Sequence, residues 1–243
     1  MKLTILGNNG PFPAAGGACS GYLIRDRGKN ILIDCGNGVL ANLQKFIRFE
    51  ELDAIILTHL HSDHISDVHV LKYAMQIKRK RGQANKLLEL YAPPDPAEEY
   101  SRLDAKDAFA LKAVSADIRL KIGDMDISFA QMKHPYMDFA VSMECSGKKF
   151  VFSGDTSWTD AIISFAAGAD LLMLDAGLLE SDYTEGAAHL TASQCGDVAL
   201  EAGVKRLLLT HFWPEYDVND LLEEARRSFS NAEASHLLNE YDV

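Results

Sequence analysis

The chain of 243 residues contains few cysteines and no long hydrophobic run. No apolar stretch approaches the ~20 residues that a membrane-spanning helix needs, so we expect no membrane partner. The four cysteines are scattered without a C-x-x-C pair, which fits buried thiols in a reducing compartment better than a disulfide framework. The first residues also lack the apolar stretch and cleavage site of a signal peptide. We therefore expect a cytoplasmic protein.

Basic residues are also in the minority, because 24 Lys and Arg stand against 35 Asp and Glu, a formal net charge of −11. Proteins that bind long nucleic acid usually present a basic surface, since phosphate contacts supply most of their affinity. The one basic run, Lys78–Arg81, ends a predicted helix, where positive charge suits the helix dipole; the alternative is a contact with a substrate phosphate. The composition therefore argues against long nucleic acid as the partner.

Four metal-binding side chains fall within six consecutive positions: His59, His61, Asp63 and His64. The apolar stretch Asp53–Thr58 precedes them as a predicted buried strand, and a helical pattern starts at Ile65. The group therefore lies at the carboxyl end of a strand, where open α/β sheets place their sites. The strand directs the first two histidines to one point and the turn directs Asp63 and His64 to another, which predicts two metals. Imidazole and carboxylate suit Zn²⁺ and also accept Mn²⁺ or Fe²⁺; the alternative is a His-rich surface loop.

Three further ligand-type residues stand just past the ends of predicted strands. His134 follows the run Asp126–Lys133, Asp155 follows an apolar run that ends in Ser-Gly, and His211 follows Leu207–Thr210. A single His at a strand end is more often structural than a ligand. Three such residues, in a chain that already carries the His and Asp group, predict one metal site built from several strand ends.

The chain reads as an α/β protein in which strands and helices follow one another twice. Predicted strands are Leu3–Leu6, Gly21–Arg25, Asn30–Asp34, Ala54–Thr58, Leu87–Tyr91, Asp126–Met132, Phe139–Cys145, Lys149–Ser153, Leu171–Asp175 and Arg206–Thr210. Predicted helices cover Val39–Ile47, the stretch from Ile65, Thr156–Ala167, Thr191–Ala202 with a capping-box pattern, and Leu221–Phe229. This order predicts a four-layer αββα sandwich of two packed mixed sheets with helices outside. We expect a single domain over residues 1–243, pseudo-duplicated with halves dividing near residue 116; the stretch from Ala92 to Ala116 is polar, partly loop and otherwise hard to assign.

The motif His59-x-His61-x-Asp63-His64, followed by His134, Asp155 and His211, resembles the metallo-β-lactamase-fold hydrolase superfamily over essentially the whole chain. Within it, the chain is most similar to the short-form ribonuclease Z and phosphodiesterase branch. The segments that carry this second likeness are Ser153–Thr156, Ala188–Thr191 and Thr210–Phe212.

The resemblance implies a division of ligands between two zinc ions. His59, His61 and His134 would hold one metal, Asp63, His64 and His211 the other, and Asp155 would bridge both. It also implies that Asp34 orients the histidine loop from behind, although a turn aspartate that bonds local amides is equally compatible with the sequence. For Asp175, at the end of a predicted strand, we expect a turn residue, and a position behind the metal ligands is the alternative. For His69 and His236 we expect no metal.

Two such metals would share one water as a hydroxide nucleophile and neutralise charge on a phosphodiester in the transition state. Asp63 and His189 are the expected catalytic residues. His189 resembles the His-x-Thr histidine of the ribonuclease Z group and would protonate the leaving oxygen, since a histidine can supply a proton at neutral pH. The alternative is a helix-entry histidine that bonds to the backbone.

The chain departs from the tRNA-processing enzymes of that branch, which carry a protruding Gly-rich and basic arm. The stretch Lys86–Ala116 is short and leans acidic. We therefore expect a small phosphodiester, such as a cyclic nucleotide, or an RNA end as substrate. Alternatives are a thioester, lactone or other acyl hydrolase of the same fold, a β-lactamase, and a metal-binding protein without activity. Relatives often form homodimers, and the helix after His64 is a candidate surface for one.

Overall fold

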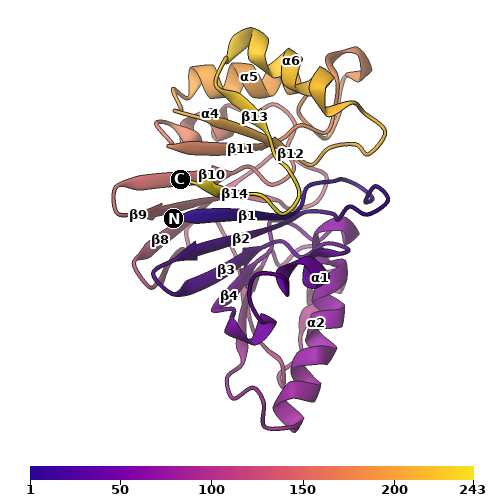
Figure 1. Cartoon of the computed structure of the whole chain (residues 1–243), viewed down its shortest axis with the longest axis vertical. Helices are drawn as coiled ribbons and strands as arrows, with labels where there is room; N and C mark the ends of the chain where they lie inside the picture. Colours follow the sequence, from indigo (N-terminus) through magenta and orange to yellow (C-terminus); the bar gives the residue numbers. More distant parts are fainter.

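The computed structural model describes residues 1–243 as four layers, with two sheets packed face to face and helices on both outer faces (Figure 1). The expected αββα sandwich of two mixed sheets is confirmed. The first sheet has the order β14-β1-β2-β3-β4-β5-β6, and the second has the order β13-β12-β11-β10-β9-β8-β7. None of the helices is long and apolar enough to cross a membrane.

The first sheet and its helices come mostly from the first half of the chain. Its strands are β1 (Lys2–Gly7), β2 (Gly21–Asp26), β3 (Lys29–Ile33), β4 (Ala54–Ile56), β5 (Leu88–Ala92), β6 (Phe109–Ala113) and, from the other end of the chain, β14 (Glu240–Asp242). Its helices are α1 (Val39–Leu43), α2 (Ser62–Lys80) and α3 (Ala97–Leu103), with a 3-10 turn η1 (Phe49–Glu51).

The second sheet and its helices come from the second half. Its strands are β7 (Arg119–Ile122), β8 (Met125–Gln131), β9 (Phe139–Cys145), β10 (Lys148–Phe152), β11 (Leu171–Asp175), β12 (Leu207–Thr210) and β13 (Ala232–Ala234). Its helices are α4 (Asp160–Ala166), α5 (Ala192–Glu201) and α6 (Val218–Ser228), with a 3-10 turn η2 (Glu180–Asp182). The point near residue 116 falls between β6 and β7, which lie in different sheets.

Alternate residues along the inner strands supply different hydrophobic layers. Ile31 and Ile33 of β3 face the second sheet, whereas Leu32 between them faces α1 and α2. On the other side, Phe150 and Phe152 of β10 join the layer between the sheets, while Val151 packs under the helices of the second half. Since both faces are covered, these strands read as continuous apolar runs rather than alternating ones.

The predicted strands are all present, with ends within about two residues, but several elements differ from expectation. The helix expected over Val39–Ile47 stops at Leu43. The helix expected from Thr156 begins only at Asp160, because Thr159 is its N-cap and accepts a hydrogen bond from the Ala161 N–H. Strands β6, β7, β13 and β14 were not predicted. All four lie at the edges of the sheets, where part-exposed side chains make the apolar sequence pattern weak.

Candidate metal centre

The side chains predicted as ligands meet where the loops at the carboxyl ends of strands from both sheets come together. His59, His61, Asp63 and His64 follow β4 and begin α2. From the second sheet, His134 follows β8, Asp155 follows β10 and His211 follows β12. Three groups of ligand atoms, each within 4.8 Å of one another, arise there: His59, His61, His134 and Asp155; Asp63, His64 and His211; and Asp155, Asp175, His189 and His211.

The first group arranges three imidazole nitrogens around a point beside Asp155. The Nδ1 atom of His61 lies 3.0 Å from Nε2 of His59 and 3.2 Å from Nε2 of His134. The Asp155 Oδ2 atom lies 3.7 Å from the same His59 nitrogen. Nitrogen ligands at about 2.0–2.1 Å from a tetrahedral zinc ion are about 3.3–3.4 Å apart, so the spacing fits a metal.

The second group has the same spacing. Nε2 of His211 lies 3.3 Å from Nε2 of His64 and 3.2 Å from the Asp63 carboxylate. Asp155 Oδ2 lies 3.4 Å from the same atom of His64 and 3.3 Å from that of His211, so this carboxylate borders both groups. Its other oxygen, Oδ1, is buried and has no hydrogen-bond partner. Burying a carboxylate oxygen without a hydrogen-bond partner costs free energy unless a bound cation neutralises its charge. These residues therefore fit a divalent metal.

Buried carboxylates lie behind three of these histidines, within ion-pair distance of their Nδ1 atoms. His59 Nδ1 lies 2.8 Å from Asp138, His64 Nδ1 lies 2.8 Å from Asp34, and His211 Nδ1 lies 3.3 Å from Asp175. His134 Nδ1 donates instead to the Ala188 carbonyl at 3.3 Å. Such contacts fix which ring nitrogen is free to bind a metal. His61 is the exception, because it presents Nδ1 to the centre.

Asp34 combines the two roles that the sequence left open. Its Oδ2 faces His64, while its Oδ1 accepts the Thr58 backbone N–H at 2.8 Å. The residue has a positive φ of 56°, and His211 has a φ of 60°. Non-glycine residues rarely adopt this region, and such strain concentrates at functional sites.

Asp138 is the residue that sequence reasoning missed, and Asp175 is one for which it favoured the wrong role. The expectation that Asp175 is only a turn residue is wrong: it is fully buried, and its Oδ2 lies 2.8 Å from His189 Nδ1 while its Oδ1 faces His211. Its position at a strand end was the available signal. Asp138 stands before β9, at the amino end of a strand, where no such signal exists.

The charge states of the centre follow from burial and from these neighbours. Burial lowers the pKa of both His59 and His61 to about 4, which leaves them neutral, as metal ligands must be. Burial alone would raise the pKa of Asp155, but the nearby His211 and His64 hold it well below its usual value. Burial raises the pKa of Asp138 well above its usual value, and the charge of Asp155 adds to the effect.

His189 lies at the open side of the centre with its side chain 29% exposed. Its ring stacks on that of His211, with centroids 5.2 Å apart, and its Nδ1 lies 3.9 Å from Asp155. Burial lowers its pKa, but the Asp175 carboxylate outweighs burial and the net pKa is raised. These contacts are with side chains, so the alternative of a histidine that bonds to the backbone at the start of a helix does not apply. His69 and His236 belong to none of the ligand groups.

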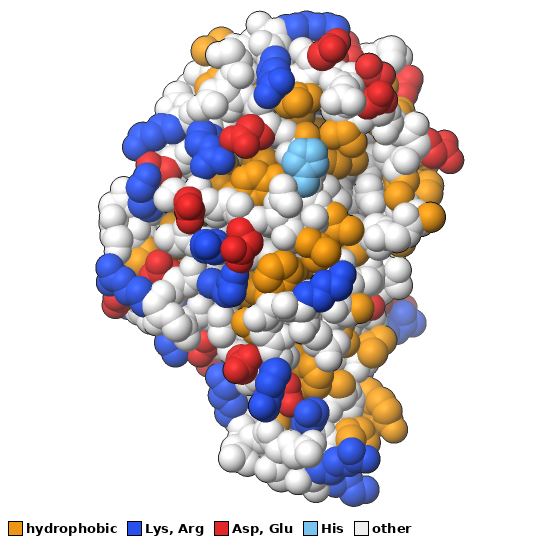
Figure 2. Space-filling model, viewed as in Figure 1, with side chains coloured by type: hydrophobic (Ala, Val, Ile, Leu, Met, Phe, Trp, Pro, Cys, Tyr) orange, Lys and Arg blue, Asp and Glu red, His pale blue; other side chains and the backbone are white.

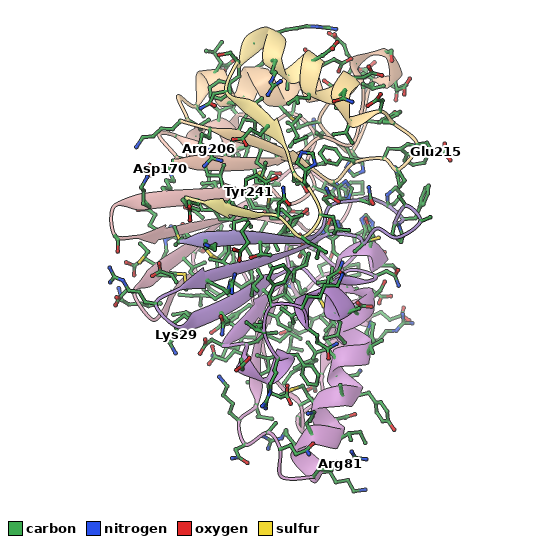
Figure 3. All side chains as sticks on the ribbon, viewed as in Figure 1. Lys29, Arg81, Asp170, Arg206, Glu215 and Tyr241 are labelled. Carbon is green, nitrogen blue, oxygen red and sulfur yellow. The ribbon has the colours of Figure 1, made fainter.

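The basic run Lys78–Arg81 lies at the far end of α2, so it is remote from the centre. A helix of 19 residues spans about 28 Å, and its first turn carries His64. The labelled Arg81 marks the tip of the molecule, where basic side chains gather (Figures 2 and 3). Lys78 pairs with Glu50 at 2.7 Å. The run therefore fits the solvated helix end better than a contact with a small substrate at the centre.

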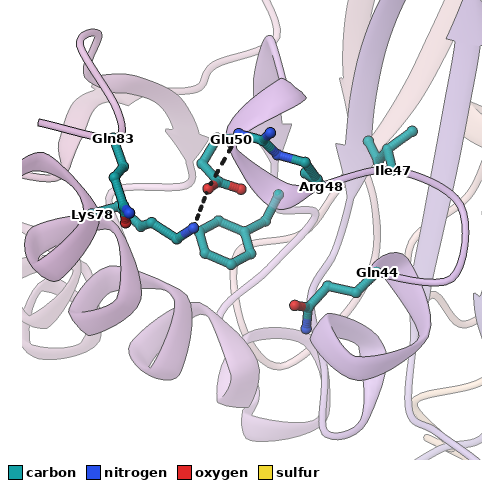
Figure 4. A pocket seen from close by; sticks show the side chains of 7 residues that line it. Gln44, Ile47, Arg48, Glu50, Lys78 and Gln83 are labelled. Carbon is teal, nitrogen blue, oxygen red and sulfur yellow. Dashed lines mark ion pairs between the residues drawn. The ribbon is translucent and has the colours of Figure 1, made fainter. Parts of the chain in front are cut away.

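A cavity also lies away from the centre, beside this helix end. It has a volume of about 610 Å³ and is lined by Gln44, Ile47, Arg48, Phe49, Glu50, Lys78 and Gln83 (Figure 4). Its one acidic side chain, Glu50, is within ion-pair distance of both basic side chains, Arg48 and Lys78. It contains no ligand-type group of the centre.

Comparison with known proteins places the chain and its fold in one family. A family model described as a beta-lactamase superfamily domain matches residues 29–212. The probable metallo-hydrolase YhfI of Bacillus subtilis is 33% identical over 235 residues, covering 97% of this chain and 96% of the relative. The crystal structure of YhfI has a TM-score of 0.95 and covers 99% of this chain and 98% of that one.

More distant matches bear the name ribonuclease Z. The ribonuclease Z of Brevibacillus brevis is 28% identical over 297 aligned positions, covering 94% of this chain and 92% of the relative. The crystal structure of the short form of human tRNase Z has a TM-score of 0.78, covers all of this chain and 99% of that one, and is 20% identical. At that identity the likeness is one of fold.

Proposed function

The chain belongs to the beta-lactamase superfamily of metallo-hydrolases, and on that premise we propose that it is a zinc-dependent, dinuclear phosphodiesterase acting on a small phosphodiester. Bound metals would supply a Lewis acid for the phosphoryl oxygens and would lower the pKa of an attacking water. His59, His61 and His134 would hold one ion, and Asp63, His64 and His211 the other. Asp155 borders both groups and is suited to bridge them.

The observation that carries the phosphodiester assignment is the position of His189. An alkoxide leaving group needs a proton as the bond to phosphorus breaks. Asp175 fixes Nδ1 of His189 at 2.8 Å, which leaves Nε2 as the nitrogen that can give a proton to a bound substrate. The same residue stacks on His211 at the solvent-exposed side, where a substrate enters. The relatives named ribonuclease Z support the same chemistry.

A dedicated tRNA substrate is disfavoured by charge and geometry. The net charge is −11, and the stretch Lys86–Ala116 folds into β5, α3 and β6 of the sandwich rather than into a protruding basic arm. Precursor tRNA should therefore be a poor substrate and bis(p-nitrophenyl) phosphate a good one. Efficient, salt-sensitive 3′ cleavage of precursor tRNA would contradict this. A homodimer formed through α2, which exposes Val70 and Tyr73, stays a prediction.

The proposal is tested by metal analysis of the purified protein beside a panel of a phosphodiester, a cyclic nucleotide, a thioester and a lactone. We expect two zinc ions per chain and hydrolysis of the phosphodiesters. A protein that cleaves only the thioester or the lactone would be an acyl hydrolase, and the phosphodiesterase proposal would be wrong.

The role of His189 is tested with leaving groups of different basicity. His189→Ala should reduce hydrolysis of a substrate with an alkoxide leaving group by about 10²–10⁴-fold. Hydrolysis of bis(p-nitrophenyl) phosphate should fall much less, because p-nitrophenolate leaves without a proton. His236→Ala, an exposed histidine outside the ligand groups, is the control. Equal losses on both substrates at unchanged metal content would exclude a general acid.

A further inference from the structure

An aromatic pair, of which one ring is exposed and the other half-buried, borders the metal centre and takes no part in the ligand groups. The rings of Phe12 and Trp213 meet edge to face, with centroids 5.3 Å apart and planes at 80°. Phe12 is 41% exposed, which makes it one of five large apolar side chains on the surface. It stands between Pro11 and Pro13, whose rings restrict the backbone on both sides. An aromatic side chain held in this way is available for contact with a ligand.

Two loops that touch His211 carry the pair. Trp213 stands two residues beyond His211, so its Cα lies within about 7 Å of the Cα of His211. Phe12 stands two residues beyond Gly10, where an added Cβ would lie only 2.0 Å from His211 Nε2. The loop after β1 and the loop after β12 reach the same edge of the molecule, where Glu215 is labelled (Figures 1 and 3).

Hydrogen bonds fix these loops to each other. The Gly10 N–H donates to the Phe212 carbonyl at 3.1 Å, and the Phe212 N–H donates to the Asn8 carbonyl at 2.8 Å. The Asn9 side chain donates to the same Phe212 carbonyl at 3.4 Å and accepts from the Ala14 N–H at 3.3 Å. The pair is therefore preorganised relative to His211, and binding a ligand against it would order little new structure.

We propose that Phe12 and Trp213 form a stacking subsite for the nucleobase of a nucleotide phosphodiester. This inference rests on the proposed function. Nucleobases stack on aromatic side chains, and the strength of this stacking depends little on which base is bound. With the phosphate at the ligand groups, a base bound on this pair would lie beside the loops that adjoin His211. A phosphodiester without a base would leave the pair exposed to water.

The test compares two inhibitors that differ only in the base, adenosine 5′-monophosphate and ribose 5-phosphate, against hydrolysis of bis(p-nitrophenyl) phosphate. In the wild-type protein we expect the nucleotide to inhibit at a concentration at least about tenfold lower than the sugar phosphate. Phe12→Ala and Trp213→Ala should remove that preference and leave inhibition by the sugar phosphate unchanged. Leu200→Ala, which removes an exposed apolar side chain on α5, is the matched control and should keep the preference.

Intrinsic fluorescence gives a readout that does not need turnover. The chain has two tryptophans, and nucleotide stacking on Trp213 should quench emission in the wild type but not in Trp213→Ala. Equal inhibition by both compounds in the wild type, without quenching, would overturn the subsite while the phosphodiesterase assignment stood. If bis(p-nitrophenyl) phosphate and the cyclic nucleotide were not hydrolysed at all, the proposed function would fail first, and this inference with it.

Discussion

Asp138 is a buried carboxylate that contacts two predicted ligands, His59 and Asp155, but belongs to none of the ligand groups itself. It accepts the Asp155 N–H at 3.0 Å and lies 2.8 Å from His59 Nδ1. Asp138→Asn keeps the size of the side chain but alters the acceptor that orients His59. We expect metal affinity to fall by about 10–100-fold, as for other residues behind metal ligands. Titration of the apoprotein with zinc against a competing chelator measures this metal affinity.

Asp53→Asn is the control for that experiment, because Asp53 accepts the Asn30 N–H at 2.9 Å beside β4 and lies outside the ligand groups. Both variants replace one carboxyl group that packs against a strand with an amide of the same size. An affinity loss of the same size in both would mean that Asp138 acts through the overall charge or the fold rather than through His59.

The sequence predicted the residues of the centre because each of them stands at the carboxyl end of a strand. His134, Asp155 and His211 all have this context, and the structure brings them to the His59–His64 segment. The partners behind the histidines were harder to recognise. Asp138 precedes its strand, and its role depends on the approach of two sheets, which no local pattern encodes.

At the scale of elements, Gly196 allows α5 and α6 to pack closely. A Cβ at this position would lie 2.3 Å from the Ala225 carbonyl oxygen of α6. Gly→Ala in an exposed helix stabilises by about 0.5–1 kcal/mol, whereas inserting a methyl group into a packed contact destabilises by about 1–3 kcal/mol. We expect the contact to dominate, so Gly196→Ala should lower the free energy of unfolding, measured by urea titration.

Metal content and hydrolysis are the companion measurements, because α5 begins just after His189. A variant that is as stable as the wild type would show that α6 moves aside at little cost. Ser193→Ala, in the first turn of the same helix, is a substitution of similar size without that contact.

Element prediction succeeded where a segment has one dominant pattern. The capping box at Thr191 is present in the structure, with the Gln194 N–H donating to Thr191 Oγ1 at 3.1 Å. It failed at the margins of the sheets. In β6 only Phe109 is buried, and its neighbours are half-buried or exposed, so the apolar signal is weak. That strand forms because β5 offers it a parallel partner, which is a tertiary effect.

At the scale of the whole molecule, the candidate metal centre joins the two halves of the sandwich. One ligand segment belongs to the first sheet, and His134, Asp155 and His211 belong to the second. Without bound cations this junction concentrates buried carboxylates, among them Asp63 and Asp155, together with facing histidine nitrogens. Metal binding would satisfy these groups in the folded state alone, so it should stabilise folding.

Removing the metals with a chelator should therefore lower the melting temperature of the whole chain. Occupancy at 100 times the dissociation constant contributes about 2.7 kcal/mol per site, so two sites would shift the midpoint by several degrees or more in a chain of this size. Calorimetry of the protein as purified, after chelation and after zinc is restored, measures the shift. Asp155→Asn should start near the chelated midpoint and respond little to zinc, because it loses the carboxylate that borders both groups. A midpoint independent of chelator would show that the two sheets hold together without metal, and that the centre serves chemistry without contributing to folding.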